Sequence, residues 1–155
     1  MDLIRYLREQ HEILLTHLNR LRREMRLPDA ETRTMKIREE IFWISELAAK
    51  HADIEEKYFV PAFRESFEKS MGPANAVLAY EHQDIREVEK AVSGLQCDIA
   101  PAKIFALAAY FIEKLSAHIE KEESVIFPLA KEMDLVLRWE DPRPGELRDT
   151  AAYEI

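Results

Sequence analysis

Apolar residues recur at spacings of three and four along most of the chain, which is the pattern of amphipathic helices. The pattern predicts four helices, covering residues 2–26, 30–69, 73–94 and the stretch that begins at Pro101. The clearest stripe runs through the first helix for three heptads and contains Ile4, Leu7, His11, Leu14, Leu18, Leu21 and Met25. His11 is the one polar residue on that stripe, so the pattern places an imidazole in the core.

Acidic residues and prolines mark the ends and weak points of these helices. Asp29 follows the break after the first helix and is suited to cap the second. Pro61 and Pro128 fall inside predicted helices, where each removes a backbone donor and crowds a carbonyl group, so a kink or a break is expected at both. The pattern fades towards the C-terminus. We therefore assign residues 1–133 to a helical domain and residues 134–155 to an irregular C-terminal tail.

The short connections between the predicted helices favour antiparallel neighbours. The sequence thus predicts an all-α fold, an up-down-up-down four-helix bundle. Its two halves resemble each other, because L-R-E-Q-H ends at His11 and L-A-Y-E-H ends at His82. The second and fourth helices would then run parallel on one diagonal, and a pseudo-twofold axis along the bundle would bring equivalent positions opposite each other.

Composition supports one ordinary globular domain. The chain has 155 residues, of which 47% are hydrophobic and 34% charged, and its 3 glycines favour long regular elements. A net charge of −8 argues against nucleic acid or an anionic membrane as the main partner. The single cysteine, Cys97, excludes an intrachain disulfide and favours a cytoplasmic location. We find neither a signal peptide nor an apolar run of the roughly 20 residues that a membrane span needs.

A short motif occurs twice in the predicted long helices. H-A-D-I-E-E begins at His51 and H-I-E-K-E-E begins at His118, and a proline follows ten residues after each histidine. Because residues four apart share one face of a helix, each histidine points the same way as Glu55 or Glu122. With the histidines of the other two helices, six polar side chains are predicted to meet at one level of the core: His11, His51, Glu55, His82, His118 and Glu122.

These residue types in apolar surroundings indicate a metal site. A glutamate four residues after a histidine is not rare in a chain rich in glutamate, and a single core histidine is more often structural, so the joint pattern decides. Burying two carboxylates without partners would cost several kcal/mol each, a penalty that metal cations remove. Imidazole with carboxylate suits redox-capable ions, iron first. The lack of thiolate ligands disfavours a structural zinc site of the cysteine-rich kind.

Other polar residues near these positions are expected to have lesser roles. His17 falls off the stripe of the first helix and is expected in solvent. Glu56 and Glu123 lie about 100° round the helix from the preceding glutamates, which predicts surface positions or contacts outside the ligand shell. Glu81 is a weaker candidate for such an outer contact. Tyr58 is either a hydrogen-bond donor near the site or, more simply, a core aromatic.

The order His, H-x-x-x-E, E-H, H-x-x-x-E resembles the hemerythrin-like family, the HHE cation-binding domains, over residues 2–132. The resemblance implies an up-and-down bundle with a non-haem di-iron centre, two iron ions joined by an oxo or hydroxo bridge. It also implies the ligands, with His11 and His51 on one iron, His82 and His118 on the other, and Glu55 and Glu122 as bridging carboxylates.

Two departures from the hemerythrin pattern bear on function. Hemerythrins carry a further histidine where this chain has Arg86, and a more widely spaced aspartate where it has Glu122. The more symmetric site leaves three hypotheses. We prefer a protein that binds or senses O2 or NO. The alternatives are a di-iron enzyme or repair factor that acts on peroxide or NO or donates iron for iron–sulfur cluster repair, and a structural or interaction module stabilised by zinc or manganese. Whether the chain is an enzyme stays open, and no protein partner is indicated.

Overall fold

The computed structural model of the chain describes residues 2–71, 86, 90 and 100–137. The described part is helical and contains no strand, which confirms the predicted all-α class. Three long helices dominate it: α1 (Leu3–Glu24), α2 (Ala30–Ile54) and α5 (Pro101–Lys121). The helix predicted over 73–94 lies outside the described residues except at Arg86 and Lys90, so the count of four helices stays a prediction.

Two of the long helices continue through a π-helical turn into a further helix. α2 passes through η1 (Glu55–Phe59) into α3 (Val60–Met71), and α5 passes through η2 (Glu122–Ile126) into α6 (Phe127–Glu132). Each π-helical turn is closed by the residue that directly follows it. The N–H of Val60 donates to the carbonyl of Glu55, and that of Phe127 to the carbonyl of Glu122.

Neither Pro61 nor Pro128 ends its helix. Each proline lies two residues after the end of a π-helical turn. A π turn inserts one extra residue and shifts the hydrogen-bond register just before the position where proline offers no N–H. The irregularity expected at the two prolines therefore takes the form of a widened turn on their N-terminal side.

Side-chain caps or a proline mark the starts of the three long helices. The side chain of Asp29 accepts a hydrogen bond of 2.7 Å from the N–H of Thr32, which confirms the predicted N-cap of α2. Asp2 caps α1 in the same way, through a 3.1 Å bond from the N–H of Ile4. Pro101 occupies the first turn of α5, where its missing N–H costs nothing.

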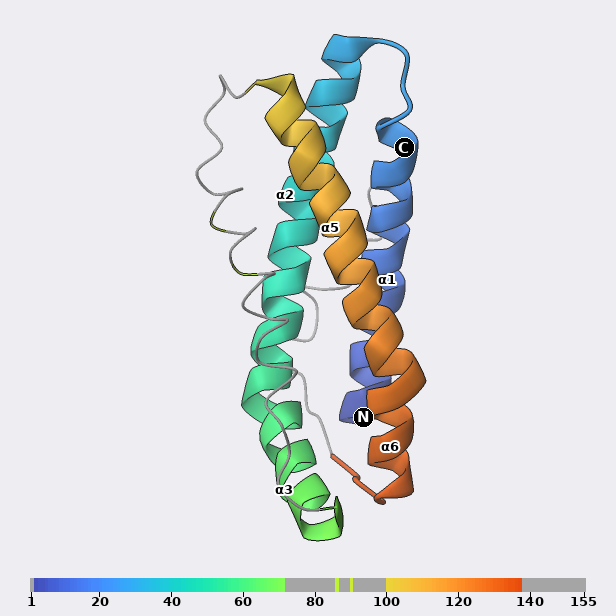
Figure 1. The fold of residues 1–155 in the computed structure, drawn as a ribbon, viewed down its shortest axis with the longest axis vertical. Coiled ribbons are helices and arrows are strands. Elements are labelled where there is room, and N and C mark those ends of the chain that lie inside the picture. The colour runs from blue at the N-terminus through green and yellow to red at the C-terminus, as the bar shows by residue number, and fades with distance from the viewer. Residues whose placement is uncertain (1, 72–85, 87–89, 91–99, 138–155) are drawn as a thin grey trace.

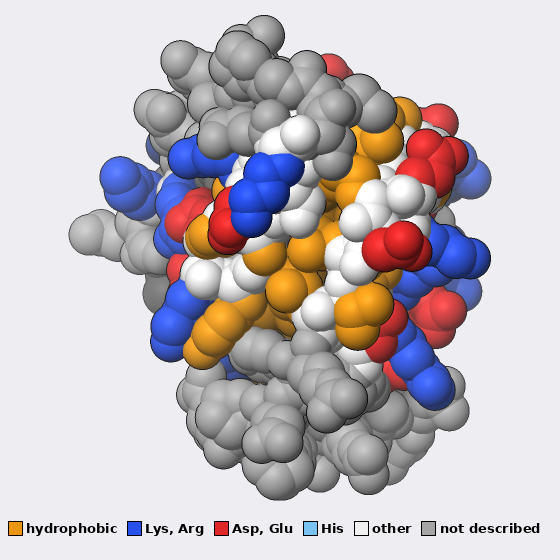
Figure 2. Space-filling model, turned by 90° about the horizontal axis from the view of Figure 1, so that it is seen from below, with side chains coloured by type: hydrophobic (Ala, Val, Ile, Leu, Met, Phe, Trp, Pro, Cys, Tyr) orange, Lys and Arg blue, Asp and Glu red, His pale blue; other side chains and the backbone are white. Residues whose placement is uncertain are grey.

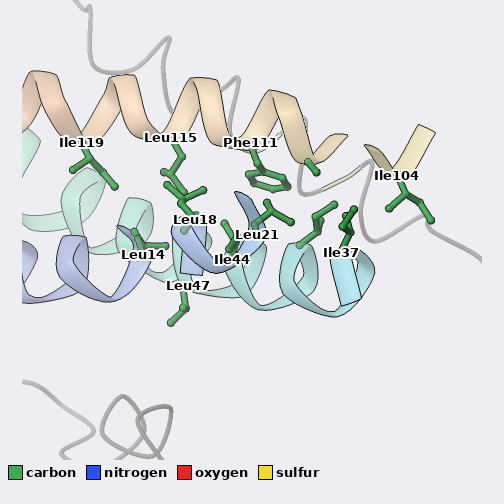
Figure 3. Packing of buried hydrophobic residues seen from close by; sticks show 13 residues of the cluster. Leu14, Leu18, Leu21, Ile37, Ile44, Leu47, Ile104, Phe111, Leu115 and Ile119 are labelled. Carbon is green, nitrogen blue, oxygen red and sulfur yellow. The ribbon is translucent and has the colours of Figure 1, made fainter. Parts of the chain in front are cut away.

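α2 and α5 run in the same direction, and α1 runs opposite to both (Figure 1). Their apolar faces meet in an upper core towards the α1–α2 connection, where α5 packs on both other helices (Figure 3). This core contains the buried residues Leu14, Leu18, Leu21, Ile37, Ile41, Ile44, Leu47, Ala48, Ile104, Ala108, Phe111, Leu115 and Ile119. The apolar stripe predicted for α1 thus lies in the core.

A second, lower core closes the opposite end of the molecule. It contains the buried residues Leu3, Ile4, Tyr6, Leu7, Phe59, Phe63, Phe127 and Ala130. Phe59 lies at its centre, with rings 5.5 Å from Phe63 and 5.4 Å from Phe127 between centroids. The polar residues of the repeated motif occupy the level between the two cores.

The chain after α6 turns back onto this lower end. Asp134 has a positive φ of 52°, which reverses the chain direction. The N–H of Leu135 then donates to the carbonyl of Ala130 at 3.0 Å, and the carbonyl of Leu137 accepts from the N–H of Leu3 at 2.8 Å. Figure 2 views this end, where apolar side chains lie in the middle of the described surface with acidic and basic side chains on either side. None of the described helices combines the length and the apolar composition that a membrane crossing requires.

Candidate metal centre

Five of the six predicted ligands meet between the two cores. α1 supplies His11, α2 and η1 supply His51 and Glu55, and α5 and η2 supply His118 and Glu122. All five side chains are buried, with at most 3% of each residue exposed. The sixth, His82, lies outside the described residues. The apolar periodicity of three separate helices therefore correctly predicted that these five side chains meet at one level of the core.

The tightest part of the cluster surrounds the imidazole of His11. Its Nε2 atom lies 3.2 Å from Nε2 of His51 and 3.1 Å from Oε2 of Glu122. Ligand atoms of His11, His51, Glu55 and Glu122 all lie within 4.8 Å of one another. Within the described ranges, this is the one group of three or more such side chains with the spacing to hold an ion.

The two motifs face each other with near-twofold symmetry. Within a motif, the histidine Nε2 and the glutamate Oε2 lie 3.4 Å apart for His51 and Glu55, and 3.5 Å apart for His118 and Glu122. Between the motifs, His51 to Glu122 and His118 to Glu55 are both 3.7 Å. One oxygen of each carboxylate is thus close to both imidazoles, which is the arrangement that a carboxylate shared between two ions needs.

The other nitrogen of two of these rings is held from outside. Nδ1 of His11 lies 2.8 Å from Oε1 of Glu123, and Nδ1 of His51 lies 2.9 Å from Oε1 of Gln10. A carboxylate and an amide oxygen only accept hydrogen bonds, so each Nδ1 carries a proton. In the neutral rings, both Nε2 atoms then present lone pairs to each other at 3.2 Å. Two facing lone pairs repel unless a cation lies between or beside them.

Electrostatics also favour a cation here. Burial lowers the pKa of His11, but the hydrogen bond and the charge of Glu122, together with Glu123 and the charge of Glu55, outweigh burial, so that the pKa of His11 is raised. A proton on His11 neutralises part of the surplus negative charge. A metal cation at the same Nε2 atom would also neutralise it, so the proton and the metal compete.

The residues present fit such a metal cation. Oε1 of Glu122 is buried and has no hydrogen-bond partner among the described residues, and Oε2 faces only imidazole nitrogens, the nearest being Nε2 of His11 at 3.1 Å. A buried carboxylate in that condition is costly unless it is neutralised or coordinates a metal. The donors are imidazole nitrogens and carboxylate oxygens, a set that suits iron, manganese or zinc.

Residues around the centre agree only in part with the predictions. Glu123 makes the expected contact outside the ligand shell, on His11. Glu56 forms an ion pair of 2.9 Å with Arg86 at the surface. Tyr58 is 38% exposed, with the ammonium of Lys57 4.8 Å from its ring centre, so the prediction of a core aromatic is wrong.

The expectation that His17 lies in solvent is wrong as well. Its side chain is 14% exposed, and Nδ1 hydrogen-bonds Oε1 of the buried Glu40 on α2. Gln10, His17 and Glu24 follow one another at intervals of seven, so they form a row beside the apolar stripe. That heptad row of polar residues is the only signal in the sequence for Gln10 and His17, and it does not decide whether they face solvent or α2.

Comparison with known proteins gives one match. The family model described as the hemerythrin HHE cation binding domain matches residues 2–130, most of the chain, which confirms the resemblance drawn from the motifs. Neither the search of curated proteins nor the search of solved structures found a match.

Proposed function

The chain belongs to the hemerythrin HHE cation-binding family, and on this premise we propose that it is a non-haem di-iron protein that binds or senses O2 or NO. The observation that carries the proposal is the pair of Nε2 atoms 3.2 Å apart, with carboxylate oxygens reaching both halves of the cluster. In the proposed site, His11 and His51 would hold one iron, and His118 and His82 the other. Glu55 and Glu122 would be the carboxylates shared between the two ions.

When bound, a pair of iron ions supplies electrons and an open position for a diatomic ligand. The chain's own residues supply the surroundings. Phe127 stacks on His11, with ring centres 5.5 Å apart, and Phe59 packs edge-on against Phe127. These rings and the upper core keep water away, which slows loss of the ligand and hydrolytic side reactions. A dry site with few proton sources favours reversible binding over turnover.

We also propose which partners the protein lacks and where it is located. A small uncharged diatomic ligand needs neither a basic surface nor a membrane, and with a net charge of −8 we expect no binding to nucleic acid or anionic lipid. The single Cys97 supports a cytoplasmic location.

The test is the metal content of the purified protein, joined to an absorption spectrum of the reduced form before and after exposure to oxygen or NO. We expect two irons per chain and a visible charge-transfer band that appears with the ligand and disappears on its removal. Irreversible oxidation with consumption of peroxide or NO would support the enzyme or repair factor instead. One redox-inert ion per chain would support the zinc or manganese module.

A further inference from the structure

Two residues outside the ligand set, Glu123 and Gln10, contact the outer nitrogens of the histidines. Their acceptor atoms lie at nearly equal distances, 2.8 Å from Nδ1 of His11 and 2.9 Å from Nδ1 of His51. The two acceptors differ in charge, because one is a carboxylate and the other an amide. The two imidazoles therefore have the same tautomer and different electrostatic surroundings.

Glu123 is itself fixed from the surface. Its second oxygen, Oε2, lies 3.0 Å from Nε of Arg8, while Oε1 holds His11. The guanidinium of Arg8 lies 5.7 Å above the ring of Phe127, which stacks on His11. An arginine, a carboxylate and an imidazole thus form one chain of contacts from the half-exposed edge of α1 to the centre of the cluster.

The π-helical turn η2 explains how one segment reaches both ends of the same ring. Glu122 and Glu123 are consecutive, yet Oε2 of Glu122 lies 3.1 Å from Nε2 of His11 and Oε1 of Glu123 lies 2.8 Å from its Nδ1. A turn closed by i→i+5 hydrogen bonds has more residues than an α turn, so consecutive side chains diverge less around the axis. The widened turn lets the two carboxylates bracket one imidazole.

Gln10 contacts His51 in the way that Glu123 contacts His11. It lies on α1 one residue before His11, is 6% exposed, and reaches across to His51 on α2. A long polar side chain buried at a helix interface needs a hydrogen-bond partner there. Its amide orients a ring from the neighbouring helix, as Glu123 orients the ring on α1.

Resting on the proposed function, we propose that Glu123 and Gln10 are positioning residues that hold His11 and His51 with Nδ1–H outward and Nε2 towards the metal. The carboxylate of Glu123, anchored by Arg8, makes His11 a stronger metal ligand than His51. The imidazoles of His11 and His51 are therefore unequal metal ligands, in spite of the symmetry of the repeated motif.

The experiment uses the full chain with Zn2+ as a diamagnetic probe. Affinity is measured by competition with a chromophoric chelator, and the imidazole tautomers are read from long-range 1H–15N correlations of the zinc-loaded protein. We expect Glu123→Ala and Gln10→Ala each to weaken zinc binding about 10- to 100-fold and to mix the tautomers of the ring that each contacts. Glu123→Gln, which keeps an acceptor but no charge, should restore the His11 tautomer and recover only part of the affinity.

Glu9→Ala is the matched control, because Glu9 is a half-exposed neighbour of Gln10 that pairs with Arg5 on the same helix. It should leave affinity and tautomers unchanged. If the wild-type chain binds no zinc and no iron, the proposed function fails. If the wild type binds and both alanine variants stay within about twofold of it, or lose affinity with the tautomers intact, the positioning role is overturned.

Discussion

Two clusters of histidine and glutamate lie along α1 in the described part of the chain, and only one of them suits a metal. The first is the candidate centre around His11 and Glu122. The second, nearer the α1–α2 connection, contains His17, Glu40 and Glu24, with Arg20 at its edge. Both are half or fully buried, and both contain a histidine on a carboxylate. Burial and residue type alone therefore do not distinguish them.

The difference lies in how each cluster balances its charge. Glu40 accepts from His17 through Oε1 and lies 3.8 Å from Arg20 through Oε2, so that its charge is met by protein groups. At the candidate centre, Oε1 of Glu122 has no hydrogen-bond partner among the described residues, Oε2 faces only imidazole nitrogens, and two imidazole lone pairs converge beside it. A metal site is marked by acceptors that outnumber the donors facing them, and not by a histidine next to a glutamate.

Removing one member from each cluster tests the distinction between them most directly. Glu55→Ala deletes a carboxylate that lies 3.4 Å from His51 and 3.7 Å from His118, and we expect loss of the proposed di-iron centre, with iron content falling from the expected two per chain to below one. His118→Ala should do the same. His17→Ala should leave the iron content unchanged. Metal analysis of the purified variants gives the result, and iron loss in His17→Ala would contradict the distinction between the clusters.

The second cluster should instead matter for stability. Glu40→Ala leaves His17 without its acceptor, and we expect the free energy of unfolding to fall by about 2 kcal/mol, less than for a fully buried pair because His17 is partly exposed. For a chain of this length the melting temperature should drop by about 4–8 °C. Thermal unfolding of the iron-loaded protein measures the change.

The neighbouring Glu39 offers the control. It is 57% exposed at the side chain and pairs weakly with Lys36 at 3.6 Å, so Glu39→Ala should change stability by less than about 0.5 kcal/mol. The iron content of Glu40→Ala should match that of the wild type. A loss of iron together with stability would mean that the two clusters are coupled.

The sequence predicted where the five described candidate ligands lie, because their positions depend on features that a helix repeats. His51 and Glu55 share a face by their spacing alone, and the apolar stripe that carries His11 is long enough to fix which side of α1 is buried. The cap at Asp29 follows from the chemistry of one side chain. These features need no knowledge of how the helices are rotated against each other.

What the sequence could not predict depends on that rotation and on the backbone register. His17 and Gln10 lie at the edge of the α1 stripe, where a small turn of the helix decides between solvent and α2. Pro61 and Pro128 indicate that the α-helical hydrogen bonds fail locally, yet they do not say whether the chain breaks, bends or widens. The π turns are one of these outcomes, and they let Glu122 and Glu123 share one imidazole.

The smallest expected effect concerns Glu24, the outermost member of the second cluster. Burial first, and then the charge of Glu40, raise the pKa of Glu24 to about 7, against a partial offset from Arg20. Its Oε2 atom is buried without a hydrogen-bond partner among the described residues. The folded state therefore holds a proton on Glu24 that the unfolded chain releases near its ordinary pKa of 4.5.

The sign follows from proton binding. Between about pH 4.5 and pH 7 the folded chain binds more protons than the unfolded chain, so the contribution of Glu24 to stability falls as the pH rises through that window. Glu24→Gln keeps the neutral shape and removes the titration. At pH 8 the variant should be more stable than the wild type by about 1 kcal/mol, a figure reduced for partial solvent screening, and the gap should close by pH 4.5. Denaturant unfolding of both chains across this range tests the prediction, because a gap that does not vary with pH would show that Glu24 is already ionised in the fold and that Arg20 balances it as it balances Glu40.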